Sequence, residues 1–224
     1  MPLNLSRPIL YLITRGATTE ATTPDSSEFR DILVLISSAV DAGIDLIQVR
    51  EKNLTARALF ELVSRAVEIK RGTSTWLLVN DRADIAAGAG ADGVHLTTQS
   101  LDAATIRKTF GKEFLIGAST HSLAEAIAAR NSGADFVVLG PIYKTKSKEQ
   151  YGSPLGVSKL SEITHGLDRF SVLALGGISA DNASDCLNAG AAGIAGISLF
   201  SEPGNLSRVV NLLRESAKEL SDDR

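Results

Sequence analysis

Short apolar runs alternate with longer amphipathic stretches along the whole 224-residue chain. The short runs are apolar throughout rather than at every second position, which is typical of parallel strands covered on both faces. They predict strands at 9–14, 45–50, 76–80, 93–96, 114–118, 136–140, 171–177 and 193–198. Between them, apolar residues recur at helical spacing and predict helices that include 56–70, 123–133, 179–190 and 206–220.

A short motif recurs where a predicted helix gives way to the next strand. Its four copies read AGID (42–45), GADG (90–93), GADF (133–136) and GAAG (190–193). Glycine at this point suits the left-handed turn that ends a helix. A chain that repeats strand and helix in this way is expected to close as one (β/α)8 TIM-barrel domain over residues 1–224. A doubly wound open sheet is the alternative, and it is less favoured because no linker or change in composition divides the chain.

Composition and charge exclude several classes of protein. Apolar residues make up 44% of the chain and charged residues 22%, as in globular proteins with a sizeable core. With a net charge of −3, the chain lacks the excess of positive charge with which proteins bind nucleic acid. No apolar run approaches the ~20 residues of a membrane span, and the N-terminal residues lack the order of a secretion signal. We therefore expect a cytoplasmic protein without nucleic-acid or membrane partners, and the sequence leaves open a homo-oligomer.

Polar residues gather where the predicted strands end. In QVREK, alternation along a strand is expected to send Gln48, Arg50 and Lys52 to one side. Two polar segments, 15–31 and 141–156, are too long to be simple connections, and both follow the carboxyl end of a strand. That end is where barrel enzymes place their chemistry. Because 141–156 combines lysines with glycines, we expect it to act as a lid over an anionic substrate.

Two kinds of segment indicate phosphate binding. TKSK (145–148) offers hydroxyl and ammonium groups. ALGGIS (174–179), with Asp181 near the start of the following helix, resembles a glycine turn that holds phosphate at a helix N-terminus. GISLF (196–200) follows the last predicted strand, and the final loops of a barrel are a recurrent phosphate site. Together these segments predict a phosphorylated substrate.

Seven motifs in order resemble one family. QVREK, NDRAD, GADGVHL, STHSLAEA, GADFVVLGPIYKTKSK, GSPLG and ALGGIS are similar to segments of thiamine phosphate synthases and the related TenI thiazole tautomerases. The resemblance implies a transferase of thiamine biosynthesis that couples hydroxymethylpyrimidine diphosphate to thiazole phosphate, releases diphosphate and uses Mg²⁺. Its substrates are small molecules, and its fold is a TIM barrel.

The same resemblance implies roles for individual residues. The pyrimidine diphosphate would be held by Gln48, Arg50, Lys52 and Asn80, and its diphosphate would contact the catalytic residues Ser119 and Lys148. The thiazole phosphate pocket would be formed by Thr145, Ser147, Gly177, Ile197 and Ser198. Asp81 would bind the metal ion.

One position departs from the family pattern. Ser100 stands where synthases carry an aspartate as second metal ligand, and a neutral hydroxyl is a weaker ligand for Mg²⁺ than a carboxylate. Two alternatives therefore stay open. The first is a metal-independent thiazole tautomerase with His121 as proton shuttle. The second is a catalytically lapsed, regulatory protein that binds thiazole phosphate.

Overall fold

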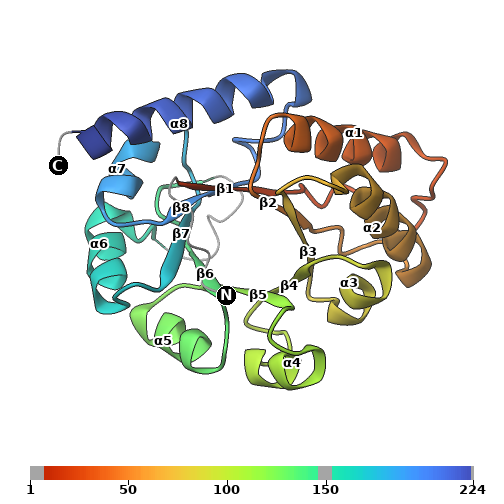
Figure 1. Ribbon diagram of the computed structural model, residues 1–224, viewed down its shortest axis with the longest axis horizontal. Coiled ribbons are helices and arrows are strands. Elements are labelled where there is room, and N and C mark those ends of the chain that lie inside the picture. Colours follow the sequence, from red (N-terminus) through yellow and green to blue (C-terminus); the bar gives the residue numbers. More distant parts are fainter. Residues whose placement is uncertain (1–7, 146–152, 223–224) are drawn as a thin grey trace.

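The computed structural model describes residues 8–145 and 153–222, and its strands form a closed barrel in chain order. Each strand pairs in parallel with the next, and β1 pairs with β8 (Figure 1). The strands are β1 (Ile9–Ile13), β2 (Leu46–Val49), β3 (Trp76–Asn80), β4 (Gly93–Leu96), β5 (Leu115–Thr120), β6 (Phe136–Leu139), β7 (Ser171–Leu175) and β8 (Gly193–Gly196). The predicted TIM barrel is confirmed, and the closed strand order excludes an open doubly wound sheet.

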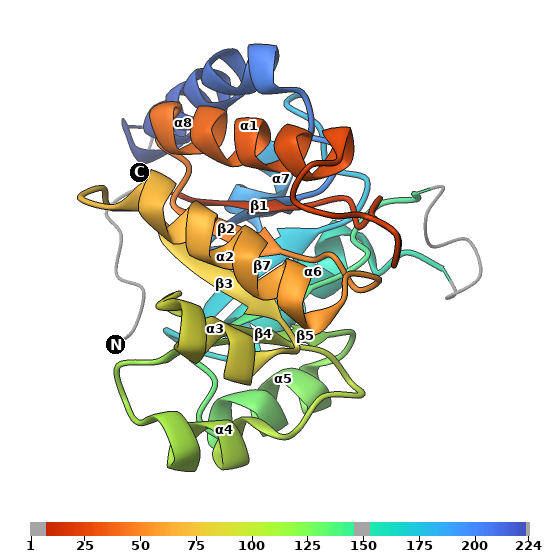
Figure 2. The same ribbon diagram turned by 90° about the vertical axis from the view of Figure 1, so that its right-hand side faces the viewer.

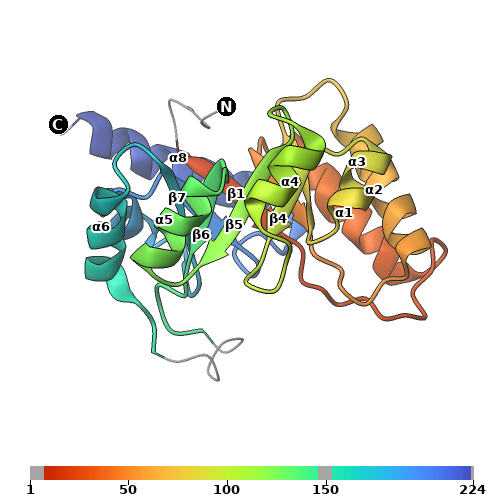
Figure 3. The same cartoon turned by 90° about the horizontal axis from the view of Figure 1, so that it is seen from below.

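Helices surround the barrel. They are α1 (Ser27–Asp41), α2 (Ala56–Lys70), α3 (Ala83–Ala89), α4 (Ala103–Phe110), α5 (Leu123–Asn131), α6 (Gly156–Gly166), α7 (Ala183–Asn188) and α8 (Leu206–Asp222), the last preceded by a 3₁₀ helix at Pro203–Asn205. Figure 3 shows α4 and α5 next to each other on the outside of β4 and β5. Within the described ranges, no helix is long and apolar enough to cross a membrane.

Local sequence explains where α2 begins. Thr55 caps α2 by accepting a hydrogen bond from the backbone N–H of Ala58, so the helix spans the predicted 56–70. The predicted loop at 15–31 is shorter than expected, because α1 begins at Ser27. The loop that remains after β1 and the one after β6 reach the same side of the barrel, on the right in Figure 2.

The repeated motif has a structural role at the opposite end of the barrel. In each copy, the glycine that follows the helix has a positive φ, as expected for the turn that ends a helix: Gly43, Gly90, Gly133 and Gly190. The aspartates Asp45, Asp92 and Asp135 each accept a hydrogen bond from the backbone N–H of the preceding strand, at Leu10, Leu77 and Ile116 respectively. Each also forms an ion pair, with Arg214, Lys70 and Arg107 respectively. These contacts join strand ends and helices away from the loops that carry the site.

The apolar residues form two layers separated by the sheet. The larger layer lies between the strands and the helices and includes Ile47, Val79, Ile116 and Val137. The smaller layer fills the barrel interior and includes Leu46, Leu78, Leu115 and Phe136 among its buried members. Neighbours along a strand thus belong to different layers, which explains why the strands are apolar throughout.

Candidate active site

Polar side chains replace the inner apolar layer towards the carboxyl ends of the strands. Gln48 and Asn80 follow the inward-facing Leu46 and Leu78 by two positions, so they share the same inner face. Both are buried, with 1% and 9% of their surface exposed. The barrel interior therefore has a buried polar layer just below the loops, and we call this layer the polar floor.

A buried chain of hydrogen bonds crosses this floor. Gln48 Nε2 donates to the Tyr11 hydroxyl at 2.8 Å, and that hydroxyl lies 3.3 Å from His95 Nδ1. His95 Nε2 lies 2.9 Å from Ser119 Oγ. The chain links four strands and ends at the serine that the family resemblance places on the diphosphate.

Burial keeps the two central rings neutral. It raises the pKa of the Tyr11 phenol far above its ordinary value. Burial, together with the smaller effect of the positive charge of Arg50, lowers the pKa of His95 to about 3. The sequence alone indicates no role for Tyr11, because a tyrosine in an apolar strand looks like a core residue. His95 does pack in the core against Tyr11 and Phe136, but its ring also contacts Ser119.

The three predicted polar residues of QVREK do not all lie on a strand: Gln48 lies on β2, whereas Arg50 and Lys52 follow its end. β2 ends at Val49, so strand alternation does not extend to Lys52, which is exposed in the following turn. Arg50 is partly buried, and its backbone N–H donates to Thr14 Oγ1 at 2.8 Å. Arg50 thus remains tied to the end of β1, beside the polar floor.

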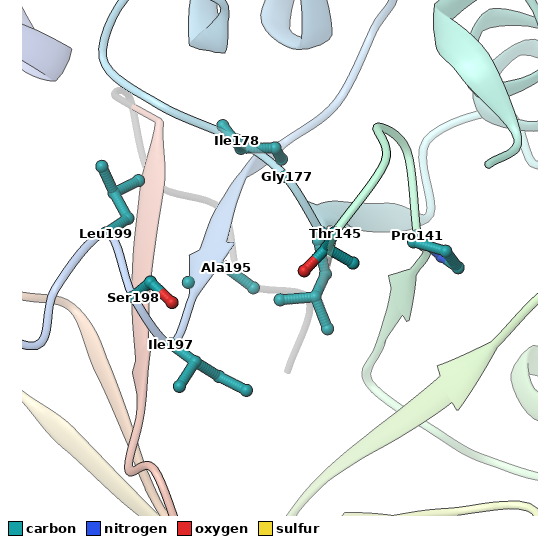
Figure 4. A pocket seen from close by; sticks show the side chains of 11 residues that line it. Pro141, Thr145, Gly177, Ile178, Ala195, Ile197, Ser198 and Leu199 are labelled. Carbon is teal, nitrogen blue, oxygen red and sulfur yellow. The ribbon is translucent and has the colours of Figure 1, made fainter. Parts of the chain in front are cut away.

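A pocket lies at the ends of β7 and β8, where the sequence predicted phosphate binding. It is open to solvent, with about 580 Å³ of empty space that includes solvent at its mouth, and it brings together the predicted residues Thr145, Gly177, Ile197 and Ser198. The hydroxyl groups of Thr145 and Ser198 point into it from different loops (Figure 4). Ser147 and Lys148, with the rest of 146–152 in the middle of the predicted lid, lie outside the described residues.

Glycine allows the two loops that form this pocket to approach closely. The loop after β6 is joined to the loop after β7 by a hydrogen bond from Tyr143 N to Gly176 O, at 2.9 Å. Gly177 has a φ of +67°, and a Cβ there would lie 2.6 Å from the Lys144 carbonyl oxygen. The predicted phosphate site at a helix N-terminus is wrong in one respect: α7 begins only at Ala183, so the glycine loop itself lines the pocket.

His121 is held at the start of α5. Ser122 caps the helix, and Glu125 accepts a hydrogen bond from the His121 backbone N–H at 2.8 Å. The ring Nδ1 lies 2.5 Å from the carbonyl oxygen of Gly140, which can only accept. Nδ1 therefore carries the proton, and in the neutral ring Nε2 is the basic nitrogen.

The predicted metal ligand follows β3 directly. Asp81 is exposed, has a left-handed φ of 63°, and donates its backbone N–H to the His95 carbonyl at 2.9 Å. Ser100 Oγ accepts a hydrogen bond from the Thr97 backbone N–H at 2.8 Å and so closes a turn. Asp102, two residues further on, caps α4 by accepting from Thr105 N with one carboxylate oxygen, so the start of that helix fixes its place. In the described part of the chain, no group of three or more histidine, cysteine or acidic residues could hold a metal ion.

The fold and the pocket together indicate a class of enzyme. This is a (β/α)8 barrel whose polar floor and glycine-lined pocket lie at the carboxyl ends of the strands, as in barrel enzymes that act on phosphorylated small molecules. Comparison with known proteins narrows the class. Residues 11–200 match the family model described as thiamine monophosphate synthase, and the chain belongs to this family.

Individual relatives agree with the family assignment. A protein of Geobacter sulfurreducens is 43% identical over 82% of this chain and 86% of its own length. The thiamine-phosphate synthase of Methanoculleus marisnigri is 39% identical over 79% of this chain and 83% of its own. Among solved structures, thiamine phosphate pyrophosphorylase from Pyrococcus furiosus superposes with a TM-score of 0.79 and 28% identity, covering 95% of this chain and 96% of the other. The resemblance in the motifs thus extends to sequence and fold as a whole.

Proposed function

We propose that this protein is a thiamine phosphate synthase, which couples hydroxymethylpyrimidine diphosphate to thiazole phosphate and releases diphosphate. The observation that carries the proposal is the pocket in which Thr145, Gly177, Ile197 and Ser198 meet. It opens at the same end of the barrel as the polar floor of Gln48, Asn80 and Ser119. Two anionic substrates can therefore be held side by side at the mouth of one barrel.

The reaction requires positioning and charge stabilisation more than covalent chemistry by the protein. The bond between the pyrimidine methylene carbon and the diphosphate oxygen breaks, and the electron pair leaves with diphosphate. The thiazole nitrogen then donates its lone pair to the resulting cation. Arg50 and the hydroxyl of Ser119 are suited to stabilise the negative charge that develops on the leaving group. The pocket residues hold the thiazole phosphate for attack in line.

Mg²⁺ is expected from the family, and the donor set fits an ion that takes most of its ligands from substrate. Asp81 supplies one exposed carboxylate, and proteins commonly bind Mg²⁺ through one or two carboxylates together with substrate phosphates. When bound, the ion would neutralise charge on the diphosphate. Ser100 would add at most a neutral oxygen.

The direct test is an assay of the purified protein with both substrates, at several Mg²⁺ concentrations, with thiamine phosphate as the measured product. We expect product formation that depends on Mg²⁺ and on both substrates. No product at saturating Mg²⁺ would contradict the proposal.

A thiazole tautomerase is the second candidate, and the geometry of His121 supports it. With Nδ1 held by Gly140, the ring has a basic Nε2 that could move a proton. His121→Ala separates the candidates. A synthase should lose less than about tenfold in turnover, because the His121 ring bonds to Gly140 O and is not one of the links between Gln48 and Ser119. A tautomerase should lose nearly all activity on the thiazole tautomer. Retained thiazole phosphate binding without either activity would indicate a lapsed enzyme.

A further inference from the structure

The hydrogen-bond chain from Gln48 through Tyr11 and His95 to Ser119 has a defined order of donors and acceptors. Tyr11 has one proton and is enclosed completely, with 0% of its surface exposed. Its oxygen already accepts from Gln48 Nε2 at 2.8 Å, and its other polar neighbour is His95 Nδ1 at 3.3 Å. If His95 also donated to this oxygen, the phenol proton would have no acceptor among the described residues. Satisfying every group therefore requires Tyr11 to donate to Nδ1.

The direction continues through the histidine ring. When Nδ1 accepts, the single proton of the neutral ring is on Nε2, which lies 2.9 Å from Ser119 Oγ. Ser119 Oγ then accepts from His95, and its own proton is free to point out of the barrel. In the opposite tautomer, Nε2 would accept from Ser119, and the serine would present lone pairs to an anionic substrate.

We propose that Gln48, Tyr11 and His95 are positioning residues that hold Ser119 as a hydrogen-bond donor to the departing diphosphate. The inference rests on the proposed function for the identity of the anion, but not for the direction of the chain. Ser119 would touch the substrate, whereas Tyr11 and His95 act through it.

Packing around the chain is consistent with this role. Gly117, two residues before Ser119 on β5, faces the same rings. A Cβ at Gly117 would lie 2.7 Å from His95 Nδ1 and 2.4 Å from Phe136 Cζ. The space that the absent side chain leaves is thus what allows the histidine ring to reach between Tyr11 and Ser119. Phe136 contacts both rings, edge-on to Tyr11 with centroids 5.7 Å apart, and it offers a control that removes packing without removing a polar group.

The first test is spectroscopic. The chain has three histidines, so their ring nitrogens can be assigned by ¹H–¹⁵N NMR. In the wild-type protein, we expect His95 to be neutral at pH 7 with the proton on Nε2. In Tyr11→Phe the Nδ1 acceptor loses its donor, and a measurable share of the other tautomer should appear. A wild-type ring protonated at Nδ1 would overturn the proposal, whether or not any variant folds.

The second test is kinetic. Tyr11→Phe should lower kcat about tenfold while leaving KM for thiazole phosphate within about twofold. Such a pattern is expected of a residue that does not touch the substrate but orients one that does. His95→Gln keeps an N–H that can reach Ser119, and it should retain more activity than His95→Asn, whose shorter amide cannot. Phe136→Leu should lower stability as much as Tyr11→Phe but preserve kcat. Equal kcat in Tyr11→Phe and wild type, or a loss that only follows stability across all four variants, would overturn the proposal.

The two tests also separate this inference from the proposed function. If the protein makes no thiamine phosphate, the proposed function fails, and the NMR measurement still decides the direction of the chain. Titration with inorganic diphosphate then provides the binding readout. Tyr11→Phe should weaken diphosphate binding more than Phe136→Leu, and equal affinities in the two variants would contradict the inference.

Discussion

The carboxylate of Glu51 holds the loop that carries Thr18. Its Oε2 accepts the Thr18 hydroxyl at 2.8 Å and the Thr18 backbone N–H at 3.3 Å, and Oε1 accepts from Gly16 N at 3.1 Å. Glu51 is only 3% exposed, although it directly follows Arg50, which is expected to meet the diphosphate. One acidic side chain thus fastens the loop after β1 to the segment after β2.

Glu51→Gln should destabilise the protein by about 2 kcal/mol, because an amide keeps one acceptor and turns the other into a donor that faces N–H groups. Thr18→Val is the matched change, since it removes the hydroxyl contact alone, and it should cost about 1 kcal/mol. Urea unfolding of the two variants measures both values. Equal losses would show that the backbone contacts of Glu51 contribute nothing.

Gly177→Ala should damage the pocket at the ends of β7 and β8. Its Cβ would lie 2.6 Å from the Lys144 carbonyl oxygen, so the two loops would have to separate. We expect at least about tenfold weaker binding of thiazole phosphate, since ligand affinity depends on loops held in place. Isothermal titration calorimetry measures the affinity for thiazole phosphate in the variant and in the wild type.

Gly43→Ala provides the control for backbone strain. Gly43 also has a positive φ, +78°, but a Cβ there would meet nothing within 4 Å. This variant should lose about 1 kcal/mol of stability and bind normally. If both variants bound thiazole phosphate equally well, the close approach at Gly177 would have no bearing on the pocket.

Much of the fold could be predicted from the sequence, because its determinants are local. Apolar runs gave the strands, and the glycines of the repeated motif gave the ends of four helices. The pocket residues Thr145, Gly177, Ile197 and Ser198 were placed by family motifs, and the structure brings them together.

The buried chain could not be predicted in the same way. Tyr11 and His95 lie 84 residues apart, and only the closed barrel brings the hydroxyl and the ring together. The space for that contact comes from an absent side chain at Gly117, which no motif marks. The expectation that strand alternation would place Lys52 beside Gln48 and Arg50 was wrong, because β2 ends at Val49, before Lys52.

The neutral, buried His95 makes stability depend on pH. Its folded pKa of about 3 lies below the ordinary 6.5, so between these values the unfolded chain binds more protons than the folded one. The stabilising contribution is complete above pH 6.5 and is lost as the pH falls towards 3. We expect wild type to lose about 2 kcal/mol more than His95→Gln between pH 7.5 and 5. His165→Gln, which replaces an exposed histidine, should follow wild type. Parallel curves for wild type and His95→Gln would contradict a buried neutral ring.

The last prediction concerns Ser100 and Asp81 as ligands for Mg²⁺. Ser100 Oγ accepts from Thr97 N at 2.8 Å, and an aspartate there can make the same bond with one oxygen and keep the other free. Ser100→Asp should therefore raise the affinity for Mg²⁺ by about tenfold, because a second carboxylate strengthens a site for a hard cation. Binding of Mn²⁺ by electron paramagnetic resonance, in the presence of inorganic diphosphate, measures the change without relying on turnover.

Asp81 requires a variant that respects its backbone. Its φ of 63° is left-handed, so alanine would add strain, whereas asparagine tolerates the conformation and removes only the charge. Asp81→Asn should abolish most Mn²⁺ binding and most synthase turnover, and Ser100→Ala should change metal affinity little. Unchanged affinity in both Ser100→Asp and Asp81→Asn would show that neither position faces the metal. If isomerisation of the thiazole persisted in these variants but required His121, the carboxylates would be irrelevant to the reaction and the tautomerase would replace the synthase.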